Sequence, residues 1–382
     1  MILRIKPEVA IERACSNCSK EVNSSQVLWY GMHIFENFRC LNCDIEITRS
    51  LPVGHGLSSS MSWLVDPPKN LASKINHKSL EIEVEALKVY EKVIILNCID
   101  YMYGHCLLKL LNAQRHLEDH PHYGLVVIIQ PFLRWMVPEG VAEVWTVDIP
   151  LREGIQYYSY FNQFVQAQLL RFTEVYLSEA YSHPRRFDIT NFTGVEKHDF
   201  HQPDVLITFV WREDRLWCHP FLERRRTLKA LRLYGVILWL QNWKIRQLFK
   251  QISLAIPEAD FAVAGLGKKT FFPNWIKDAR VENFDDLTEK QTCQLYSDSR
   301  LIIGVHGSSM LLPSAHAGMT IDLMPKDRWG NFAQDIIYQE NDPRLSSFKY
   351  RYLPIMTNVS MITYIAKTMV MKYFKFQSSM VN

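Results

Sequence analysis

Four cysteines near the N-terminus have the spacing of metal ligands. They form two Cys-x-x-Cys pairs, Cys15 with Cys18 and Cys40 with Cys43. Two residues between thiolates let one tight turn present both sulfurs to a single tetrahedral ion, and a second pair completes an S4 shell that favours zinc. Because a closed shell leaves no open position for water, the sequence predicts one structural zinc and no catalytic metal.

The segment between the two pairs is typical of a zinc ribbon. Residues 26–40 alternate between apolar and polar side chains like two strands. We interpret His33 as an ordinary strand histidine, since four thiolates already complete the shell. Lys20 and Arg39 stand beside several acidic residues. A basic stripe is therefore missing, and we expect no nucleic-acid partner.

A histidine-glycine loop follows an apolar strand in the last third of the chain. Gly307 permits close backbone approach, and the N–H groups from Ser308 and Ser309 onward open a helix-like run. Backbone N–H groups at such a place form an anion site suited to a diphosphate. His306 could hydrogen-bond a phosphate oxygen or a sugar hydroxyl, whereas the alternative is a buried core histidine.

Two further loops carry cations after strands. Arg212 and Arg215 follow an apolar run and could bracket a diphosphate bidentately, or they could belong to a surface network with acidic residues. Gly265 and Lys268 lie in a Gly-Leu-Gly-Lys-Lys segment, which is a second candidate phosphate loop. The lysine of that segment could equally be solvated.

Asp100 and His105 stand at a strand-to-helix turn in the first half of the chain. A histidine there can act as a general base while a nearby carboxylate fixes its tautomer. The alternative is an unremarkable histidine in the first turn of a helix.

The elements that position these loops alternate between strand and helix. We expect strands at 89–100, 124–130, 141–150, 204–211, 235–240, 260–267, 300–305 and 319–325, and helices near 106–119, 163–180, 224–234, 244–255 and 288–297. This order predicts an α/β fold with two parallel sheets, in whose post-strand loops ligands bind. The expected domains are 1–60 (zinc ribbon and linker), 61–200, 201–345, and a C-terminal helix at 346–382 that packs back on the N-terminal domain.

The composition is that of a folded chain. Of 382 residues, 48% are hydrophobic and 22% are charged, and the net charge of +3 is too small for a general polyanion binder. The first residues lack the apolar core of a secretory signal, and no segment is apolar for the roughly 20 residues of a membrane span. We therefore expect a cytoplasmic location, reduced cysteines and no transmembrane segment.

Motifs in both halves of the chain resemble glycosyltransferase family 61. The resemblance covers about residues 95–330 and is carried by DVLITFVWRED, by the loop VHGSSM followed by TIDLMP, and by the helix start YGHCLLKLL. It implies a GT-B fold of two Rossmann-like domains, with acceptor bound mainly by the first and nucleotide sugar by the second. The residues that match the family's donor positions are Arg212, His306, Gly307, Ser308 and Asp322, and His105 matches the histidine on the acceptor side.

The leading hypothesis is an inverting, metal-independent glycosyltransferase that moves a sugar from a nucleotide sugar to a saccharide or lipid-linked acceptor hydroxyl. Asp285 and Asp286 are interpreted as a helix cap, not as a metal-binding pair. Two alternatives stay open. One is a polysaccharide pyruvyl transferase, and the other is a non-catalytic zinc-ribbon adaptor that binds a nucleotide or a protein.

Overall fold

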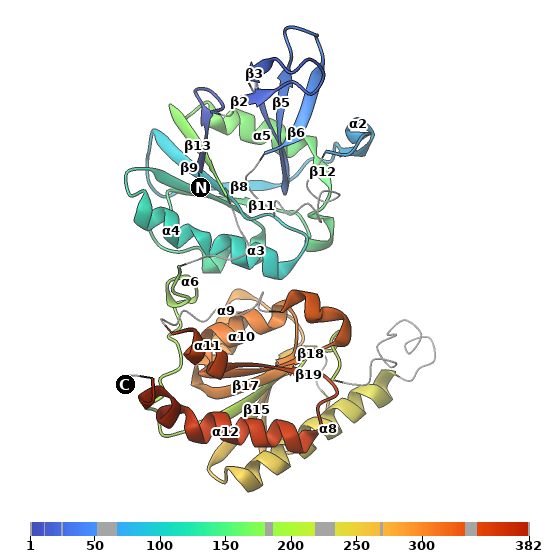
Figure 1. Cartoon of the computed structure of the whole chain (residues 1–382), viewed down its shortest axis with the longest axis vertical. Coiled ribbons are helices and arrows are strands. Elements are labelled where there is room, and N and C mark those ends of the chain that lie inside the picture. Colours follow the sequence, from blue (N-terminus) through green and yellow to red (C-terminus); the bar gives the residue numbers. More distant parts are fainter. Residues whose placement is uncertain are drawn as a thin grey trace. The chain divides into compact units, whose positions relative to one another are not determined.

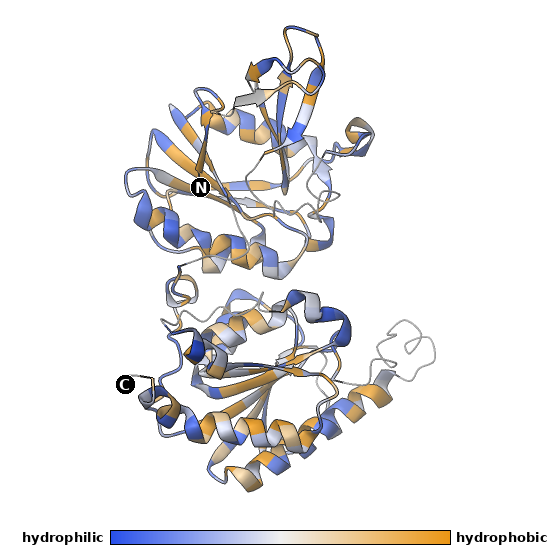
Figure 2. Cartoon of the chain, in the orientation of Figure 1, coloured by the Kyte–Doolittle hydropathy of each residue, from blue (hydrophilic) through white to orange (hydrophobic). Residues whose placement is uncertain are grey.

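The computed structural model divides into two compact units, Met1–Asp188 (unit 1) and Ile189–Asn382 (unit 2) (Figure 1). It describes residues 2–10, 12–23, 26–51, 67–179, 186–217, 234–267, 270–332 and 342–380. Both units are built on six-stranded, largely parallel sheets, as the sequence predicts. Most strands are hydrophobic, as Figure 2 shows, because helices or a hairpin cover the sheet faces.

The sheet of unit 1 has the order β1-β13-β9-β10-β11-β8. Its four central strands are parallel, whereas β1 and β8 pair antiparallel at the two edges. The strands are β1 (Ile2–Lys6), β8 (Ile82–Ala86), β9 (Lys92–Asn97), β10 (Gly124–Ile129), β11 (Glu143–Val147) and β13 (Glu174–Ser178). Residues 174–178 were expected to end a helix, but alternate residues of β13 are buried beside β9 and the helix stops at Leu169.

Helices cover both faces of this sheet. The helices α3 (Tyr103–Leu110) and α4 (Asn112–Asp119) contact β9 and β10. The helix α5 (Ser159–Leu169) contributes to the hydrophobic core that contains Val93 and Ile95 of β9. The short elements of the unit are α2 (Leu71–Lys74), β7 (Ile75–Asn76), η2 (Pro131–Met136), η3 (Leu151–Glu153) and β12 (Tyr157–Tyr158).

The cysteine-bearing segment is fused to unit 1 and does not form a separate domain. Its strands are β2 (Glu12–Ala14), β3 (Glu21–Asn23), β4 (Gln26–Tyr30), β5 (His33–Arg39) and β6 (Glu46–Ser50). Val27, Trp29 and Ile34 of the β4–β5 hairpin lie in the same hydrophobic core as β9 and α5. The expected domain of residues 1–60 is therefore wrong, because β1 lies in the main sheet and the hairpin needs α5 to cover its apolar side.

The sheet of unit 2 is parallel throughout, in the order β16-β15-β14-β17-β18-β19. The strands are β14 (Val205–Val210), β15 (Ala259–Leu266), β16 (Ile276–Val281), β17 (Ser299–Val305), β18 (Met319–Met324) and β19 (Tyr350–Pro354). The chain adds two strands on one side of β14 and three on the other, which is the order of a doubly wound nucleotide-binding sheet. The edge strands β16 and β19 were missed, since their sequences alternate too weakly to stand out.

Four helices cover the two faces of this sheet. The helices are α8 (Tyr234–Ala255) and α12 (Val359–Ser378) on one face, and α9 (Asp286–Asp298) with α10 (Leu311–His316) on the other (Figure 1). The remaining elements are α6 (Thr190–Thr193), η5 (Ser308–Met310), η6 (Lys326–Asn331) and α11 (Pro343–Lys349).

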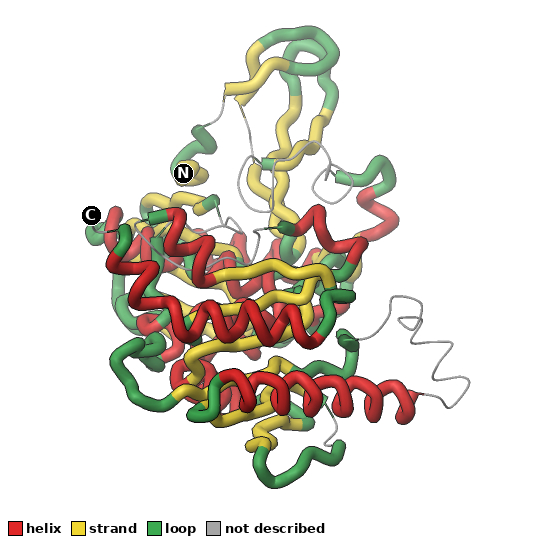
Figure 3. Tube along the Cα trace, turned by 60° about the horizontal axis from the view of Figure 1, so that its bottom comes forward, coloured by secondary structure: helices red, strands yellow, loops and turns green. Residues whose placement is uncertain are grey.

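Two expectations about these helices are wrong. Residues 235–240 were expected to form a strand, but Figure 3 draws α8 as one unbroken helix, and only Ile237 and Leu238 of that run are buried. The C-terminal helix, which was expected to pack on the N-terminal domain, belongs to unit 2 and packs against α8 and β17. Its buried residues recur at helical spacing and belong to the core of that sheet: Ile362, Ala366, Met369 and Tyr373. The helix expected at 224–234 lies almost wholly outside the described residues.

Candidate functional site

The carboxyl ends of β14 and β17 mark the point in unit 2 at which the strand order reverses. From β14 the chain continues to β15 and β16 on one side, and it then returns to the other side of β14 with β17, β18 and β19. In open α/β sheets ligands bind outside the carboxyl ends of the strands at this point. The loops that begin with Trp211 and with His306 leave the sheet there.

A cavity of about 260 Å³ lies at these strand ends. Its walls come from the segments that follow β14 and β18 and from the last residue of β17, and the lining residues are Glu213, Asp214, Arg215, Leu216, Val305, Pro325, Asp327 and Arg328. Two arginines from different loops therefore line one cavity together with three carboxylates, and guanidinium groups can bind a phosphate or diphosphate.

Arg215 is held against the histidine-glycine turn. Its guanidinium donates to the His306 carbonyl oxygen at 3.1 Å. A Cβ on Gly307, whose φ is +150°, would lie 2.8 Å from the Arg215 Cζ. Burial, followed by the charges of Arg328 and Arg212, lowers the pKa of Arg215 from its usual value. The carboxylates of Asp214 and Asp327, which also line the cavity, partly offset this positive charge.

Arg212 is paired inside its own loop. Its Nε and Nη2 donate to the two carboxylate oxygens of Asp214 at 2.6 and 2.7 Å. Burial opposes ionisation of Asp214, but the hydrogen bond and charge of Arg212 outweigh it and keep the pKa of that carboxyl below its usual value. Of the two arginines expected to bracket a diphosphate, only Arg215 lines the cavity.

His306 and Asp322 form a buried pair behind the cavity. The His306 Nδ1 lies 2.9 Å from the Asp322 Oδ2, and the Tyr350 hydroxyl donates to the same oxygen at 2.9 Å. The carboxylate favours the tautomer with a proton on Nδ1. Asp322 thus orients His306, and Tyr350, which carries no motif signal, supports Asp322.

The serines of the histidine-glycine loop follow Gly307 directly. Ser308 and Ser309 open the 3-10 turn η5 directly before α10. The Ser309 hydroxyl is buried, and no hydrogen-bond partner for it is found among the described residues.

Gly265 has a packing role in place of the expected phosphate contact. It lies in β15 with φ +129°, and a Cβ there would be 2.0 Å from the Trp211 carbonyl oxygen. The glycine makes room for the backbone at Trp211, and this close approach explains why a glycine stands at this position of the sequence. Lys268, from the same expected loop, lies outside the described residues.

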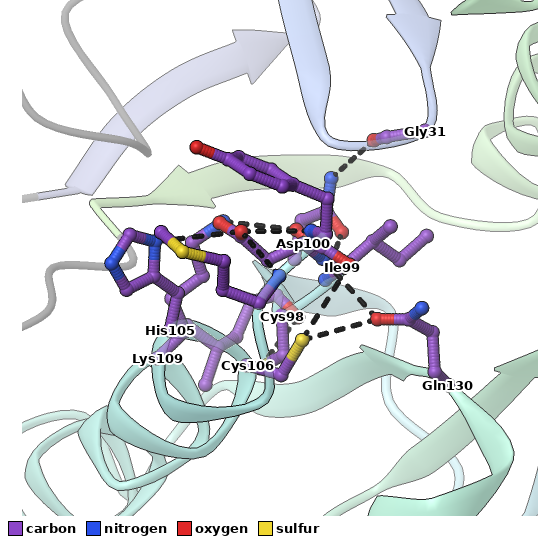
Figure 4. A network of polar contacts seen from close by, with 12 residues as sticks. Gly31, Cys98, Ile99, Asp100, His105, Cys106, Lys109 and Gln130 are labelled. Carbon is purple, nitrogen blue, oxygen red and sulfur yellow. Dashed lines mark hydrogen bonds and ion pairs between the residues drawn. The ribbon is translucent and has the colours of Figure 1, made fainter. Parts of the chain in front are cut away.

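Unit 1 gathers Asp100, His105 and Lys109 at the carboxyl end of β9 (Figure 4). Asp100 is fully buried, and its Oδ2 lies 2.9 Å from the Lys109 Nζ. Its Oδ1 accepts the N–H groups of Tyr101 and Met102 at 2.8 and 3.1 Å. The His105 Nδ1 lies 3.4 Å from the same oxygen, and a quarter of the His105 side chain is exposed. Asp100 can orient the ring but, being buried, cannot itself reach an acceptor.

The tip of the β4–β5 hairpin reaches the same strand end. Asn97 donates to the Gly31 carbonyl oxygen at 2.8 Å, and the His33 Nε2 lies 2.9 Å from the Ile155 carbonyl oxygen. His33 is therefore a tip residue that binds backbone, consistent with its not being a metal ligand. Sequence reasoning missed Asn97 and Gly31 because neither belongs to a recognisable motif.

Cys15, Cys18, Cys40 and Cys43 form a cluster, the cysteine cluster, whose sulfurs all lie within 4.8 Å of one another. The Sγ–Sγ distances are 3.6 Å for Cys15–Cys43 and 3.5 Å for Cys18–Cys40. A tetrahedral zinc with Zn–S bonds of about 2.3 Å requires about 3.8 Å, so the geometry fits that ion. Hydrogen bonds from the backbone of Cys18 and Asn17 lower the pKa of Cys15 to about 6, which favours its thiolate.

The two turns of the cluster share one backbone geometry. Ser19 and Asp44 each follow the second cysteine of a pair and have φ values of 57° and 58°. Their N–H groups donate to the carbonyl oxygens of Cys15 and Cys40 at 2.9 and 2.7 Å. Two matched turns present four sulfurs to one point.

The cysteine cluster is the one metal-ligand group found in the described part of the chain. The acidic pair at 285–286 behaves as expected, because the Asp285 side chain accepts the Thr288 N–H at 2.8 Å and caps α9. Among the described residues, no helix is long and apolar enough to cross a membrane.

No protein-family model and no curated protein matches this chain. Among solved structures, the chain is similar to the E. coli ADP-heptose LPS heptosyltransferase II, at 11% sequence identity and a TM-score of 0.42. The match covers 74% of this chain and 99% of the other. A likeness at this level says nothing about activity, which rests on the chain's own residues.

Proposed function

We propose that the chain is an inverting, metal-independent glycosyltransferase of the GT-B type that uses a nucleotide-sugar donor. The observation that carries the proposal is the arginine-lined cavity at the switch point of a doubly wound parallel sheet. Nucleotide diphosphates are the ligands that this position of such a sheet suits best. The resemblance to glycosyltransferase family 61 in the same loops supports the same choice.

The donor diphosphate would lie against Arg215 and Arg328, with the Ser309 hydroxyl and the turn at Gly307 beside it. Negative charge develops on the diphosphate as the bond between the sugar and the phosphate oxygen breaks. Arg215 carries a fixed positive charge in a half-buried setting, where such stabilisation is stronger than in open water. No divalent ion is needed for this role.

The acceptor base would be His105. Its Nδ1 faces Asp100, so the neutral ring would carry its proton there and present Nε2 to an acceptor hydroxyl. His105 would take the proton, and the acceptor oxygen would attack the anomeric carbon opposite the leaving diphosphate, which inverts the configuration. Asp100 would be a positioning residue, which refines the expectation that it could serve as the base itself.

Zinc in the cysteine cluster would be structural. Four thiolates would complete its shell, so it offers no position to a substrate. The acceptor, saccharide or lipid-linked, is defined only as a hydroxyl compound.

Binding of UDP, GDP, CDP and CMP, measured by thermal shift and then by calorimetry, tests the donor site. Arg215→Ala should weaken the best ligand by about 10- to 150-fold, which corresponds to about 1.5–3 kcal/mol for a hydrogen bond to a charged group. Arg344→Ala removes an exposed arginine of the same unit and should leave the affinity unchanged. Equal affinities of the Arg215 variant and the wild type would remove the donor site from the proposal.

Turnover of the donor found in that screen tests the base. His105→Ala should lower turnover by about 10² to 10⁴ without changing nucleotide affinity, because the base acts only in the transition state. The exposed His122 gives the matched control. Binding of phosphoenolpyruvate without any nucleotide would favour the pyruvyl transferase, and nucleotide binding without turnover of any sugar would favour the adaptor.

A further inference from the structure

The outer face of α8 and α12 in unit 2 is apolar and aromatic although it is exposed. The two helices lie side by side on one side of the sheet, and their outward residues are those turned away from the core (Figure 1). On α8 the stripe is Val236, Trp239, Leu240 and Trp243, and on α12 it is Met361, Tyr364, Met371 and Phe374. These spacings follow the helical repeat, so the residues form continuous stripes.

The same two helices carry positive charge only. Their cations are Lys244, Arg246 and Lys250 on α8, and Lys367, Lys372 and Lys375 on α12. Neither helix contains an aspartate or a glutamate, although the chain has 40 acidic residues. Folding of unit 2 does not require this excess of positive charge, because the hydrophobic core of the unit is formed by other residues, on the inward sides of both helices.

We propose that this face, the α8–α12 face, docks on the surface of an anionic lipid bilayer. Exposed tryptophans and tyrosines beside apolar residues suit the boundary between headgroups and acyl chains. Lysines around them suit anionic headgroups, and their flexible stems keep the charge at the surface while the apolar part is buried. The helices would lie in the plane of the interface, since neither is apolar enough to cross it.

Charge argues against a second copy of the chain as the occupant. Two such faces packed about a two-fold axis would bring like lysines together without an acidic partner from either helix. An anionic bilayer offers the complementary charge and an apolar layer at the same place.

Flotation with vesicles tests the proposal on the whole protein. Wild type should bind vesicles of phosphatidylglycerol and phosphatidylcholine more tightly than vesicles of phosphatidylcholine alone, and salt should weaken that binding. Trp239→Ala with Trp243→Ala should weaken it at least about tenfold, through lost apolar burial. Lys367→Glu with Lys372→Glu should weaken it at least about 20-fold, since each cation near such a surface contributes about fivefold.

Controls come from other surfaces of unit 2. Leu287→Ala removes an exposed apolar residue of α9, and Lys277→Glu with Lys290→Glu makes the same change in net charge away from α8 and α12. Both should bind like the wild type. Absence of wild-type binding to anionic vesicles, or equal loss in these controls, would overturn the proposal. Nucleotide binding by the same samples shows that unit 2 is folded, and it tests the donor site independently.

Discussion

The buried ion pair between Asp100 and Lys109 allows a quantitative test of the unit 1 site. The two side chains are 0% and 2% exposed, and the Lys109 Nζ also donates to the Ile99 carbonyl oxygen at 2.9 Å. Lys109→Met removes one charge and leaves the buried carboxylate without the cation that neutralises it. Asp100→Asn removes the other, while its amide oxygen can still accept the backbone N–H groups at the start of α3.

The expected magnitude follows from the burial. Removing one partner of a buried pair costs about 3–5 kcal/mol, because the remaining charge has lost its compensation. The double variant leaves no buried charge, and the amide introduced by Asp100→Asn keeps the two backbone contacts, so it should cost only about 1–2 kcal/mol. The two single changes should therefore be strongly coupled: the double variant should lose less free energy of unfolding than the two single variants lose together.

Urea unfolding of the wild type, both single variants and the double variant gives this coupling energy. Arg186 and Glu118, an exposed pair of the same unit, supply the matched cycle, which should show little or no coupling. Additive costs at Asp100 and Lys109, within about 0.5 kcal/mol, would refute the reasoning. In that case Asp100 would not be a structural charge, and a direct role in proton transfer would have to be considered again.

Elemental analysis should return about one zinc per chain, and Cys40→Ser should lose that metal and loosen the β4–β5 hairpin; full zinc occupancy in the variant would be inconsistent with the cluster. Burial lowers the pKa of His198 to about 4 and of His116 to about 3. Both rings take up protons below about pH 6.5 in the unfolded chain but not in the folded one, so each histidine should lower the free energy of unfolding by about 2 kcal/mol between about pH 7 and 5. Urea unfolding of His198→Gln at both pH values should show a loss that is smaller by the contribution of this histidine. Gly265→Ala should destabilise unit 2 by forcing Trp211 away, whereas a merely ligand-contacting glycine would leave the urea midpoint unchanged.

The parallel sheets could be predicted because their central strands are short apolar runs with polar ends. The runs that became β9, β10, β14, β17 and β18 are buried on both faces, and such runs can be recognised without any long-range information. The run 235–240 is just as apolar but begins a helix. Over so few residues, periodicity in the sequence does not distinguish a buried strand from a half-buried helix. The two are distinguished only in the structure, where a half-buried helix buries every third or fourth residue.

The predicted site residues divide according to how local their chemistry is. The Cys-x-x-Cys pairs and the turn at Gly307 are local motifs, and the structure places each of them as a compact unit. Arg212 and Arg215 stand in one loop, and nothing local distinguishes the arginine that pairs with Asp214 from the one that lines the cavity. That choice depends on Gly307, which lies far along the chain.

Two of the residues that the sequence did not indicate act through contacts between distant segments. Tyr350 supports Asp322 from an edge strand, and Gly31 meets Asn97 from the tip of a hairpin. Their roles arise only when the fold brings these segments together. Lys109, in contrast, neutralises Asp100 from the helix that follows it in the chain, and no motif marks it. The base of that hairpin lies beside the cysteine cluster while its tip contacts the end of β9, so one hairpin connects the metal-ligand turns to the strand that precedes Asp100 and His105. The cysteine cluster thus belongs to the framework of the unit 1 site, although its spacing alone indicates an independent module.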